Sequence, residues 1–193
     1  MNDPIEQFDK WLEEAKAHPS ILEPTAMSLA TSTKAGIPSV RMVLLKDFDA
    51  RGFVFYTHME SRKSEELKAN PHAALCFFWK ALFRQVRIEG TVEQVSNAEA
   101  DAYFATRPLG ARIGAHVSQQ SHTLASHEEL IRKAGEFSKR YSEQNPPPRP
   151  DNWSGWRVAP SAIEFWQEGK FRLHDRDLYT RMGKGWEVRK LYP

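Results

Sequence analysis

Strand-like segments lie in both halves of this chain, and the helical segments between them do not alternate with the strands. "AMSLATS", "SVRMVLLK" and "FVFYTH" follow one another, with turns at 36–38 and 49–52 between them. A parallel, doubly wound sheet needs a helix after almost every strand, so this order argues against it. We therefore predict an α+β fold that is mainly antiparallel β, a barrel with peripheral helices.

The later strands fit the same plan. "HAALCFFW" and "FRQVRIEGTVEQV" should form two more, and Gly90 within the second marks a candidate β-bulge. The last four predicted strands or strand ends are "WRVAP", "AIEFWQEG", "FRLHDRDLYTRM" and "WEVRKLYP". Residues 146–150 form a stiff Pro-rich linker before this C-terminal strand segment, 153–193, and we expect a single domain over residues 1–193.

Capping residues predict where the helices begin. A helix should cover residues 3–18, with Asp3 as its N-cap and an apolar stripe along one face. A short helix is predicted over 61–70, and capping-box patterns precede "ADAYFAT" and "LIRKAGEFSKRY". The stretch between these last two helices, residues 107–126, is predicted to be a polar connection.

The composition restricts the class of partner. A net charge of +2 over 193 residues gives no reason to expect nucleic-acid binding. The only cysteine, Cys76, excludes an internal disulfide, and its place in the apolar run "AALCFFW" predicts a buried, inert thiol. The N-terminus has no apolar signal core, and no apolar run is long enough to span a bilayer. We expect a cytoplasmic protein with no membrane partner.

Common nucleotide and metal motifs do not occur in the sequence. It contains no G-x-G-x-x-G, no G-x-x-x-x-G-K-[ST], no H-E-x-x-H and no paired C-x-x-C. His116, His122 and His127 are close in sequence but match no ligand spacing, and surface histidines commonly titrate in solvent. We predict that the protein has no metal site.

Cations and hydroxyls gather instead at predicted strand ends. Arg41 and Lys46 bracket "RMVLLK", and Tyr56-Thr57 end a later strand. "SRK" at 61–63 opens the next helix, where free backbone N–H groups and the helix dipole favour an anion. The alternative is a pair of solvated charges on a first helical turn.

Amides and an aromatic side chain add to this inventory. Gln85 lies in a predicted strand, where a buried amide needs a partner, although an exposed strand face is the alternative. Gln120-Ser121 add an amide and a hydroxyl, and Trp166 adds an indole that alone would suit a hydrophobic core. Together with the cations, these groups suit a phosphorylated heterocycle. They do not separate a nucleotide from a flavin.

The stretch "FRLHDRDLYT", residues 171–180, contains an unusual row of basic side chains. If it is a strand, Arg172, His174 and Arg176 share one face. Like charges in one row repel each other, so the row predicts either a fully solvated basic face or an anion lying against it. The residues alone leave both alternatives open.

The chain resembles the pyridoxamine 5′-phosphate oxidase family in segments that follow in order from about residue 4 to residue 193. These segments are "RMVLLK", "FYTHMESRKSEEL", "FRQVRIEG", "YFATRP", "IGAHVSQQS", "IEFWQEGKFRLHDR" and the terminal "LYP". The resemblance implies an FMN-binding split β-barrel with peripheral helices. It also implies a homodimer that binds FMN in a groove at the dimer interface.

The resemblance further implies which residues bind the cofactor and the substrate. The implied FMN contacts are Arg41, Met42, Val43, Leu44, Leu45, Lys46, Tyr56, Thr57, Ser61, Arg62, Lys63, Gln85, Gln120, Ser121, Trp166 and Arg176. The implied substrate contacts are Lys46, Tyr103, Arg107, Arg172 and His174, of which Arg172 and His174 are the implied catalytic pair.

The family oxidises pyridoxine or pyridoxamine 5′-phosphate to pyridoxal 5′-phosphate, in vitamin B6 biosynthesis and salvage. By resemblance, a hydride leaves C4′ of the substrate for N5 of the flavin, and dioxygen reoxidises the flavin to give hydrogen peroxide. The protein then supplies orientation and electrostatics. Because a guanidinium stays protonated, we interpret Arg172 as a charge that holds the substrate and stabilises negative charge on the ring oxygen.

Two departures from the family pattern matter. Ala111 stands in "RPLGARIGA" where many members have a Ser whose hydroxyl helps to hold the substrate phosphate. Many members also have an N-terminal extension over the active site, and we expect that lid to be missing or differently made here. Two alternative functions stay open: a related FMN oxidase of another ring, as in phenazine-pathway relatives, or a non-catalytic flavin- or haem-binding split barrel.

Overall fold

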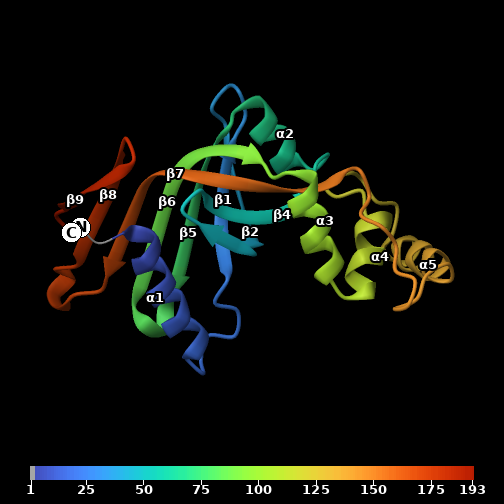
Figure 1. Cartoon of the computed structure of the whole chain (residues 1–193), viewed down its shortest axis with the longest axis horizontal. Coiled ribbons are helices and arrows are strands. Elements are labelled where there is room, and N and C mark those ends of the chain that lie inside the picture. The colour runs from blue at the N-terminus through green and yellow to red at the C-terminus, as the bar shows by residue number, and fades with distance from the viewer. Residues whose placement is uncertain (1–2) are drawn as a thin grey trace.

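A curled antiparallel sheet of nine strands forms the centre of the computed structural model, which describes residues 3–193 (Figure 1). The strands are β1 (Ala26–Ser32), β2 (Pro38–Leu44), β3 (Asp47–Asp49), β4 (Gly52–His58), β5 (His72–Trp79), β6 (Arg84–Gln94), β7 (Trp153–Gln167), β8 (Asp175–Met182) and β9 (Gly185–Lys190). They pair in the order β2-β1-β5-β6-β7-β4-β3, and β8 and β9 extend from β7. Every pairing is antiparallel, which confirms the predicted fold class.

The long strand β7 connects the two ends of the sheet. Residues 153–158 pair with β4, residues 162–167 pair with β8, and β6 follows β7 along most of its length. The register between β6 and β7 shifts at Gly90, which confirms the predicted bulge. A Cβ at Gly90 would lie 2.0 Å from the carbonyl oxygen of Ala159, so this close approach requires glycine. The segments predicted as two separate strands, "WRVAP" and "AIEFWQEG", form this one strand.

The hydrophobic core lies between one face of the sheet and α1 (Pro4–Ala17). The carboxylate of Asp3 accepts a hydrogen bond from the Ile5 N–H at 2.9 Å, which confirms the predicted N-cap. Phe8 on the apolar stripe is fully buried and makes edge-to-face contacts with Phe53 and Phe77. Cys76 points to the opposite face of β5 and is only half-buried, so the predicted full burial is wrong; burial still raises the pKa of the thiol.

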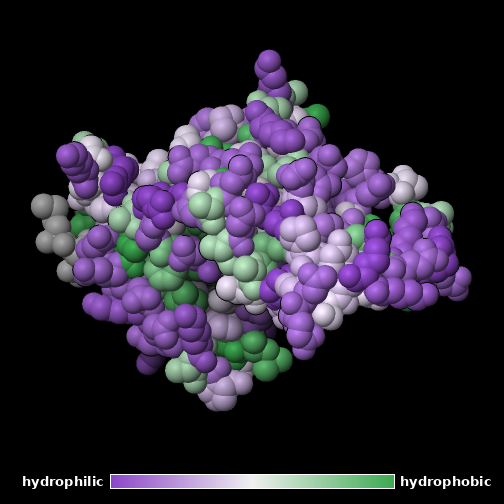
Figure 2. All heavy atoms as spheres, turned by 45° about the vertical axis from the view of Figure 1, so that its right-hand side comes forward, coloured by the Kyte–Doolittle hydropathy of each residue, from purple (hydrophilic) through white to green (hydrophobic). Residues whose placement is uncertain are grey.

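The remaining helices lie beside and beyond the sheet. They are α2 (Arg62–Ala69), α3 (Asn97–Thr106), α4 (Leu109–Val117) and α5 (His127–Ser138), and two single 3₁₀ turns cover Lys80–Leu82 and Lys170–Arg172. Helices α3, α4 and α5 form one end of the molecule, and the β8–β9 hairpin forms the other (Figure 1). Hydrophilic side chains cover the α5 end (Figure 2). Among the described residues, no helix is long and apolar enough to cross a membrane.

The sequence predicts a polar connection over residues 107–126. This prediction is wrong for residues 109–117, which form helix α4. Gly110 and Gly114 make this stretch a weak helix former. Ile113 and Ala115 are nevertheless buried, and α4 packs against α5. Tertiary packing of this apolar face outweighs the poor intrinsic propensity.

The segment 171–174 corrects a second prediction. It does not continue the strand, because Phe171 and Arg172 have φ angles of 58° and 65° and form a turn. Strand β8 begins only at Asp175. Arg172, His174 and Arg176 therefore do not share one strand face, since a left-handed backbone breaks the alternation of side chains.

Candidate functional site

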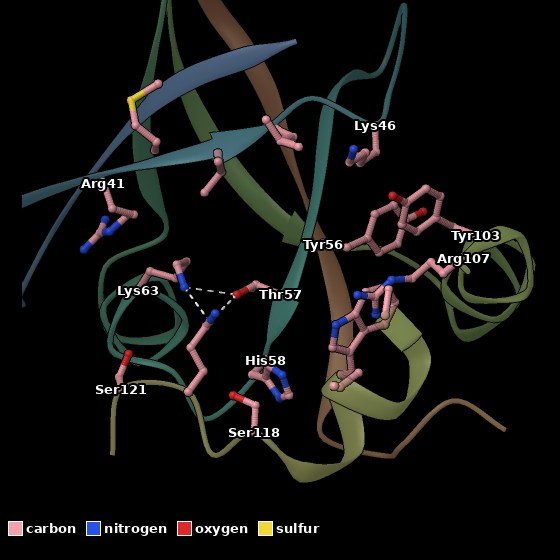
Figure 3. Close-up of a pocket in the computed structure, with 18 of the residues that line it drawn as sticks. Arg41, Lys46, Tyr56, Thr57, His58, Lys63, Tyr103, Arg107, Ser118 and Ser121 are labelled. Atoms are coloured by element: carbon pink, nitrogen blue, oxygen red, sulfur yellow. Dashed lines mark hydrogen bonds between the residues drawn. The ribbon is translucent and has the colours of Figure 1, made fainter. Parts of the chain in front are cut away.

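A cavity of about 740 Å³ lies between the sheet and helices α2, α3 and α4 (Figure 3). Its walls come from β2, the β4 end, the first turn of α2 and one side of α3 and α4. The predicted site residues that line it are Arg41, Met42, Val43, Leu44, Lys46, Tyr56, Thr57, Arg62, Lys63, Tyr103, Arg107, Gln120 and Ser121. The fold thus brings together most of the residues that the sequence singled out.

Lys63 forms the centre of the cationic end of this cavity. Its Nζ donates to Oγ1 of Thr57 at 3.1 Å, as Figure 3 shows, and to Oε1 of Gln120 at 2.7 Å. The ammonium is buried, and this desolvation, followed by the charge of Arg41, lowers its pKa to about 8. Among residues 3–193 only neutral oxygens hold this buried cation, which makes it a candidate to bind an anion.

The start of α2 adds backbone donors to the same end. Ser61 is the N-cap residue, as predicted, but its hydroxyl donates to the carbonyl of His58 at 2.7 Å. Within residues 3–193 the Ser61 side chain accepts no hydrogen bond from the helix N–H groups. These N–H groups and the positive end of the helix dipole are therefore available to an anion.

The lowered pKa of Lys63 leads to a pH prediction for a phosphorylated ligand such as FMN. Below about pH 8 the ammonium is already charged, whereas above it binding must include uptake of a proton. FMN affinity should therefore stay level near neutral pH and then fall as the pH rises, by up to roughly tenfold per pH unit. Fluorescence titration of the flavin-free protein measures this.

The control ligand for this titration is riboflavin, which lacks the phosphate and should show no such fall. Lys63→Met should bind FMN more weakly and without this pH dependence. An FMN affinity that falls equally in Lys63→Met would contradict the assignment to Lys63.

An aromatic wall forms the opposite side of the cavity. The rings of Tyr56 and Tyr103 stack at 4.1 Å, and the ring of Trp153 stacks on Tyr56 at 5.3 Å. Burial raises the pKa of Tyr56 to about 12, so this phenol stays neutral. The guanidinium of Arg107 lies 4.6 Å over Trp153, and burial lowers its pKa. Among the described residues, Nη1 of Arg107 is buried without a hydrogen-bond partner, which suits an acceptor on a ligand.

Three cavity residues with polar or aromatic side chains were not predicted from the sequence: His58, Ser118 and Trp153. His58 is buried, and burial and then the charges of Lys63 and Arg107 lower the pKa of its imidazole. The available signal for His58 was its place at the end of a strand, directly after Tyr56-Thr57. Trp153 carried no such signal, since an aromatic residue at a strand start is typical of a core.

A second group of predicted residues lies on the outer face of the sheet, opposite the hydrophobic core. Gln85, Trp166 and Arg176 are direct neighbours in one row across β6, β7 and β8. Nε of Arg176 donates to Glu164 at 2.9 Å, and its Nη1 donates to the carbonyl of Tyr192 at 2.8 Å.

The turn after β7 holds the last two predicted residues beside this row. The ring of His174 lies 4.7 Å from that of Trp166, and its Nδ1 accepts a hydrogen bond from the Gly169 N–H at 3.2 Å. This bond places the proton of the neutral imidazole on Nε2. A Cβ at Gly169 would lie 1.8 Å from the Leu173 carbonyl oxygen, so the turn requires glycine there. Arg172 is exposed on the same turn.

The two groups are far apart within one chain. Trp153 of the cavity and Trp166 of the outer row lie at opposite ends of β7, roughly 40 Å apart along the strand. The predicted residues outside the cavity are Leu45, Ser61, Gln85, Trp166, Arg172, His174 and Arg176. Leu45 belongs to the hydrophobic core, and Ser61 is fully buried under the α2 turn.

Comparison with known proteins identifies the family to which the chain belongs. The family described as pyridoxamine 5′-phosphate oxidase matches residues 13–167. The chain belongs to this family. The description "Pyridoxine 5′-phosphate oxidase C-terminal dimerisation region" matches residues 153–193, so this family region begins where β7 begins.

Individual relatives agree with the family assignment. The chain is 54% identical to a pyridoxine/pyridoxamine 5′-phosphate oxidase of Gluconobacter oxydans, over 99% of this chain and 94% of that one. It is 49% identical to the protein of that description from Pelagibacter ubique, over 98% and 90%. Among solved structures, PhzG from Burkholderia lata in complex with tetrahydrophenazine-1-carboxylic acid has a TM-score of 0.94 at 32% identity, covering 100% of this chain and 94% of that one.

Proposed function

We propose that this chain is an FMN-dependent oxidase that converts pyridoxine 5′-phosphate and pyridoxamine 5′-phosphate to pyridoxal 5′-phosphate. The observation that carries the proposal is the cavity, where two separate sets of cationic side chains, each suited to a phosphate, flank one space. Arg41, Arg62 and Lys63 form one set, and Lys46 and Arg107 belong to the other. The relatives that are 49% and 54% identical share the same described substrates.

FMN fits the first set by its chemistry. The buried ammonium of Lys63, held only by neutral groups, and the free N–H groups of α2 suit its phosphate. When bound, FMN would supply the redox chemistry, as acceptor of a hydride from C4′ of the substrate and donor of two electrons to dioxygen, which gives hydrogen peroxide. With pyridoxamine 5′-phosphate, water would then release the amino group as ammonia. The apolar side chains of β2 at 42–44 would lie along its ring system.

The substrate phosphate suits the second set. Arg107 offers a buried, unpartnered Nη1 among the described residues, and the neutral phenol of Tyr103 offers a hydroxyl beside it. Ala111 lines the same wall and provides no hydroxyl. The charge of Arg172 would stabilise negative charge on the ring oxygen, and Nε2–H of His174 would donate to the substrate.

A homodimer would unite the two groups of site residues. The outer sheet face presents exposed apolar side chains, with Val40, Met42 and Phe78 each more than half exposed. The match to a family dimerisation region over 153–193 supports a second copy on this face. We infer that the outer row and the 169–174 turn of one chain complete the cavity of its partner.

The decisive experiment uses the visible spectrum of the FMN-loaded protein without oxygen. Adding pyridoxamine or pyridoxine 5′-phosphate should bleach the flavin absorbance and form pyridoxal 5′-phosphate, and admitting air should restore the absorbance with release of hydrogen peroxide. Bleaching by a reduced phenazine precursor alone would favour the activity suggested by the PhzG likeness. A protein that binds flavin but is bleached by neither compound would be a non-catalytic split barrel.

A further inference from the structure

A buried carboxylate lies among the cations of the proposed phosphate site. Glu66 of α2 is buried, with only 6% of its side chain exposed, although its neighbours in space include Arg41 on β2 and Arg62 on its own helix. An acid beside a phosphate site opposes the binding of an anion. Glu66 should therefore have a role whose benefit to binding outweighs this repulsion.

The hydrogen bonds that Glu66 accepts suggest this role. Oε1 accepts from Nε of Arg62 at 2.9 Å, and Oε2 accepts from Nη2 of Arg41 at 3.3 Å. Oε2 also accepts from the hydroxyl of Ser39 at 2.5 Å and from that of Thr31. One carboxylate thus connects two strands, a helix and both guanidiniums.

The hydroxyls of Ser39 and Thr31 also bind Arg41 directly. Nη2 of Arg41 donates to Ser39 at 2.5 Å, and its Nη1 donates to Thr31 at 2.5 Å. Each arginine uses only part of its five-donor fork on these contacts. The remaining N–H groups are held in a fixed direction, and both side chains line the cavity.

The charge state of Glu66 is secured by the same contacts. Burial alone would raise its pKa, but the hydrogen bonds from Ser39, Thr31, Arg62 and Arg41 lower the pKa to about 2. Arg41, Arg62 and Lys63 then carry three positive charges against one negative charge. The net charge matches a phosphate group, which carries about −1.5 to −2 at pH 7.

We propose that Glu66 is a positioning residue for the cofactor phosphate: it aims Arg41 and Arg62, and this ordering outweighs its own repulsion of the phosphate. The inference rests on the proposed binding of FMN. Removing this negative charge from the phosphate site should therefore weaken the binding of the phosphate.

The test measures FMN and riboflavin affinities of flavin-free variants by fluorescence titration. Glu66→Gln removes the charge, so both arginines lose a charge-assisted bond, and FMN affinity should fall roughly tenfold while riboflavin affinity stays unchanged. Combining Glu66→Gln with Arg62→Gln should give less than the sum of the two single losses, because Glu66 acts through that arginine. FMN binding that is unchanged or tighter in Glu66→Gln would overturn the proposal.

Glu65→Gln is the matched control. Glu65 is the preceding residue on α2, is exposed and pairs with Lys68 at 2.8 Å, so this change removes the same charge without releasing Arg41 or Arg62. Its FMN affinity should equal that of the wild type or rise slightly. Equal losses in Glu65→Gln and Glu66→Gln would show a general charge effect and refute positioning.

A second variant covers the case in which Glu66→Gln does not fold. Glu66→Asp keeps the charge but shortens the reach by one methylene, so it should also weaken FMN and spare riboflavin. Wild-type FMN affinity in Glu66→Asp would overturn the proposal. If the wild type itself bound riboflavin as tightly as FMN, the proposed phosphate site would fail instead, which keeps the two outcomes distinct.

Discussion

A heterodimer made from Lys63→Met and Arg176→Met chains should be active, although each variant alone should be almost inactive when FMN is limiting. Lys63 lies in the cavity and Arg176 lies in the outer row, far along the chain's own sheet. If each site takes the cavity of one chain and the outer row of its partner, the heterodimer contains one intact site. Its specific activity should be about half that of the wild type. Co-expression with two different tags gives the pure heterodimer for this assay.

A second heterodimer provides the control. In a heterodimer of one Lys63→Met chain and one Arg41→Met chain, both changes fall in the cavity group. Each of the two sites then carries one defect, so activity should not return. An inactive Lys63→Met/Arg176→Met heterodimer would mean that each chain holds a complete site, and would contradict the shared arrangement.

Much of the fold follows from local patterns in the sequence. The predicted strands at 26–32 and 72–79 match β1 and β5 at both ends. The Asp3 cap and the Gly90 bulge are also where the sequence places them. These features depend on alternation, capping hydrogen bonds and close backbone approach, each of which involves a few neighbouring residues.

The errors arise where tertiary packing or an irregular backbone overrides the local pattern. Helix α4 forms despite two glycines because Ile113 and Ala115 find a packing partner. The turn at 171–174 breaks a pattern that alternates well, and the hydrogen bond from the Gly169 N–H to His174 spans it. The packing partner of α4 lies outside any short window, whereas the turn at 171–174 is local but overrides the alternation that the same window contains.

The candidate site shows the same limit at a larger scale. The family resemblance brought Lys63 and Arg176 into one list of cofactor contacts. The structure shows that the two residues lie in separate groups of one chain, which no linear pattern reveals. His58 and Trp153 complete the cavity only through folding, since β4 and β7 pair at Thr57–Ser154 and His58–Trp153.

Arg172→Met should lower kcat/KM by about 10- to 150-fold while FMN remains bound, because it would remove the charged hydrogen bond that we propose Arg172 makes to the substrate, worth roughly 1.5–3 kcal/mol. The guanidinium of Arg172 makes no hydrogen bond or ion pair to another described residue, so its loss should leave the protein's own contacts intact. Met is the matched replacement, since it keeps much of the apolar stem and is no more suited to the left-handed backbone than Arg. Steady-state kinetics at saturating FMN measure the effect.

Arg176→Met is the opposing control. Its side chain is tied to Glu164 and to the Tyr192 carbonyl, so its guanidinium is held at the outer row and the resemblance assigns it to the cofactor. This variant should lose FMN on dilution and regain activity when excess FMN is added. The two roles are reversed if Arg172→Met loses flavin while Arg176→Met retains it. If neither change affects turnover or flavin binding, the basic side chains at 172–176 are the solvated surface that the sequence left as the alternative.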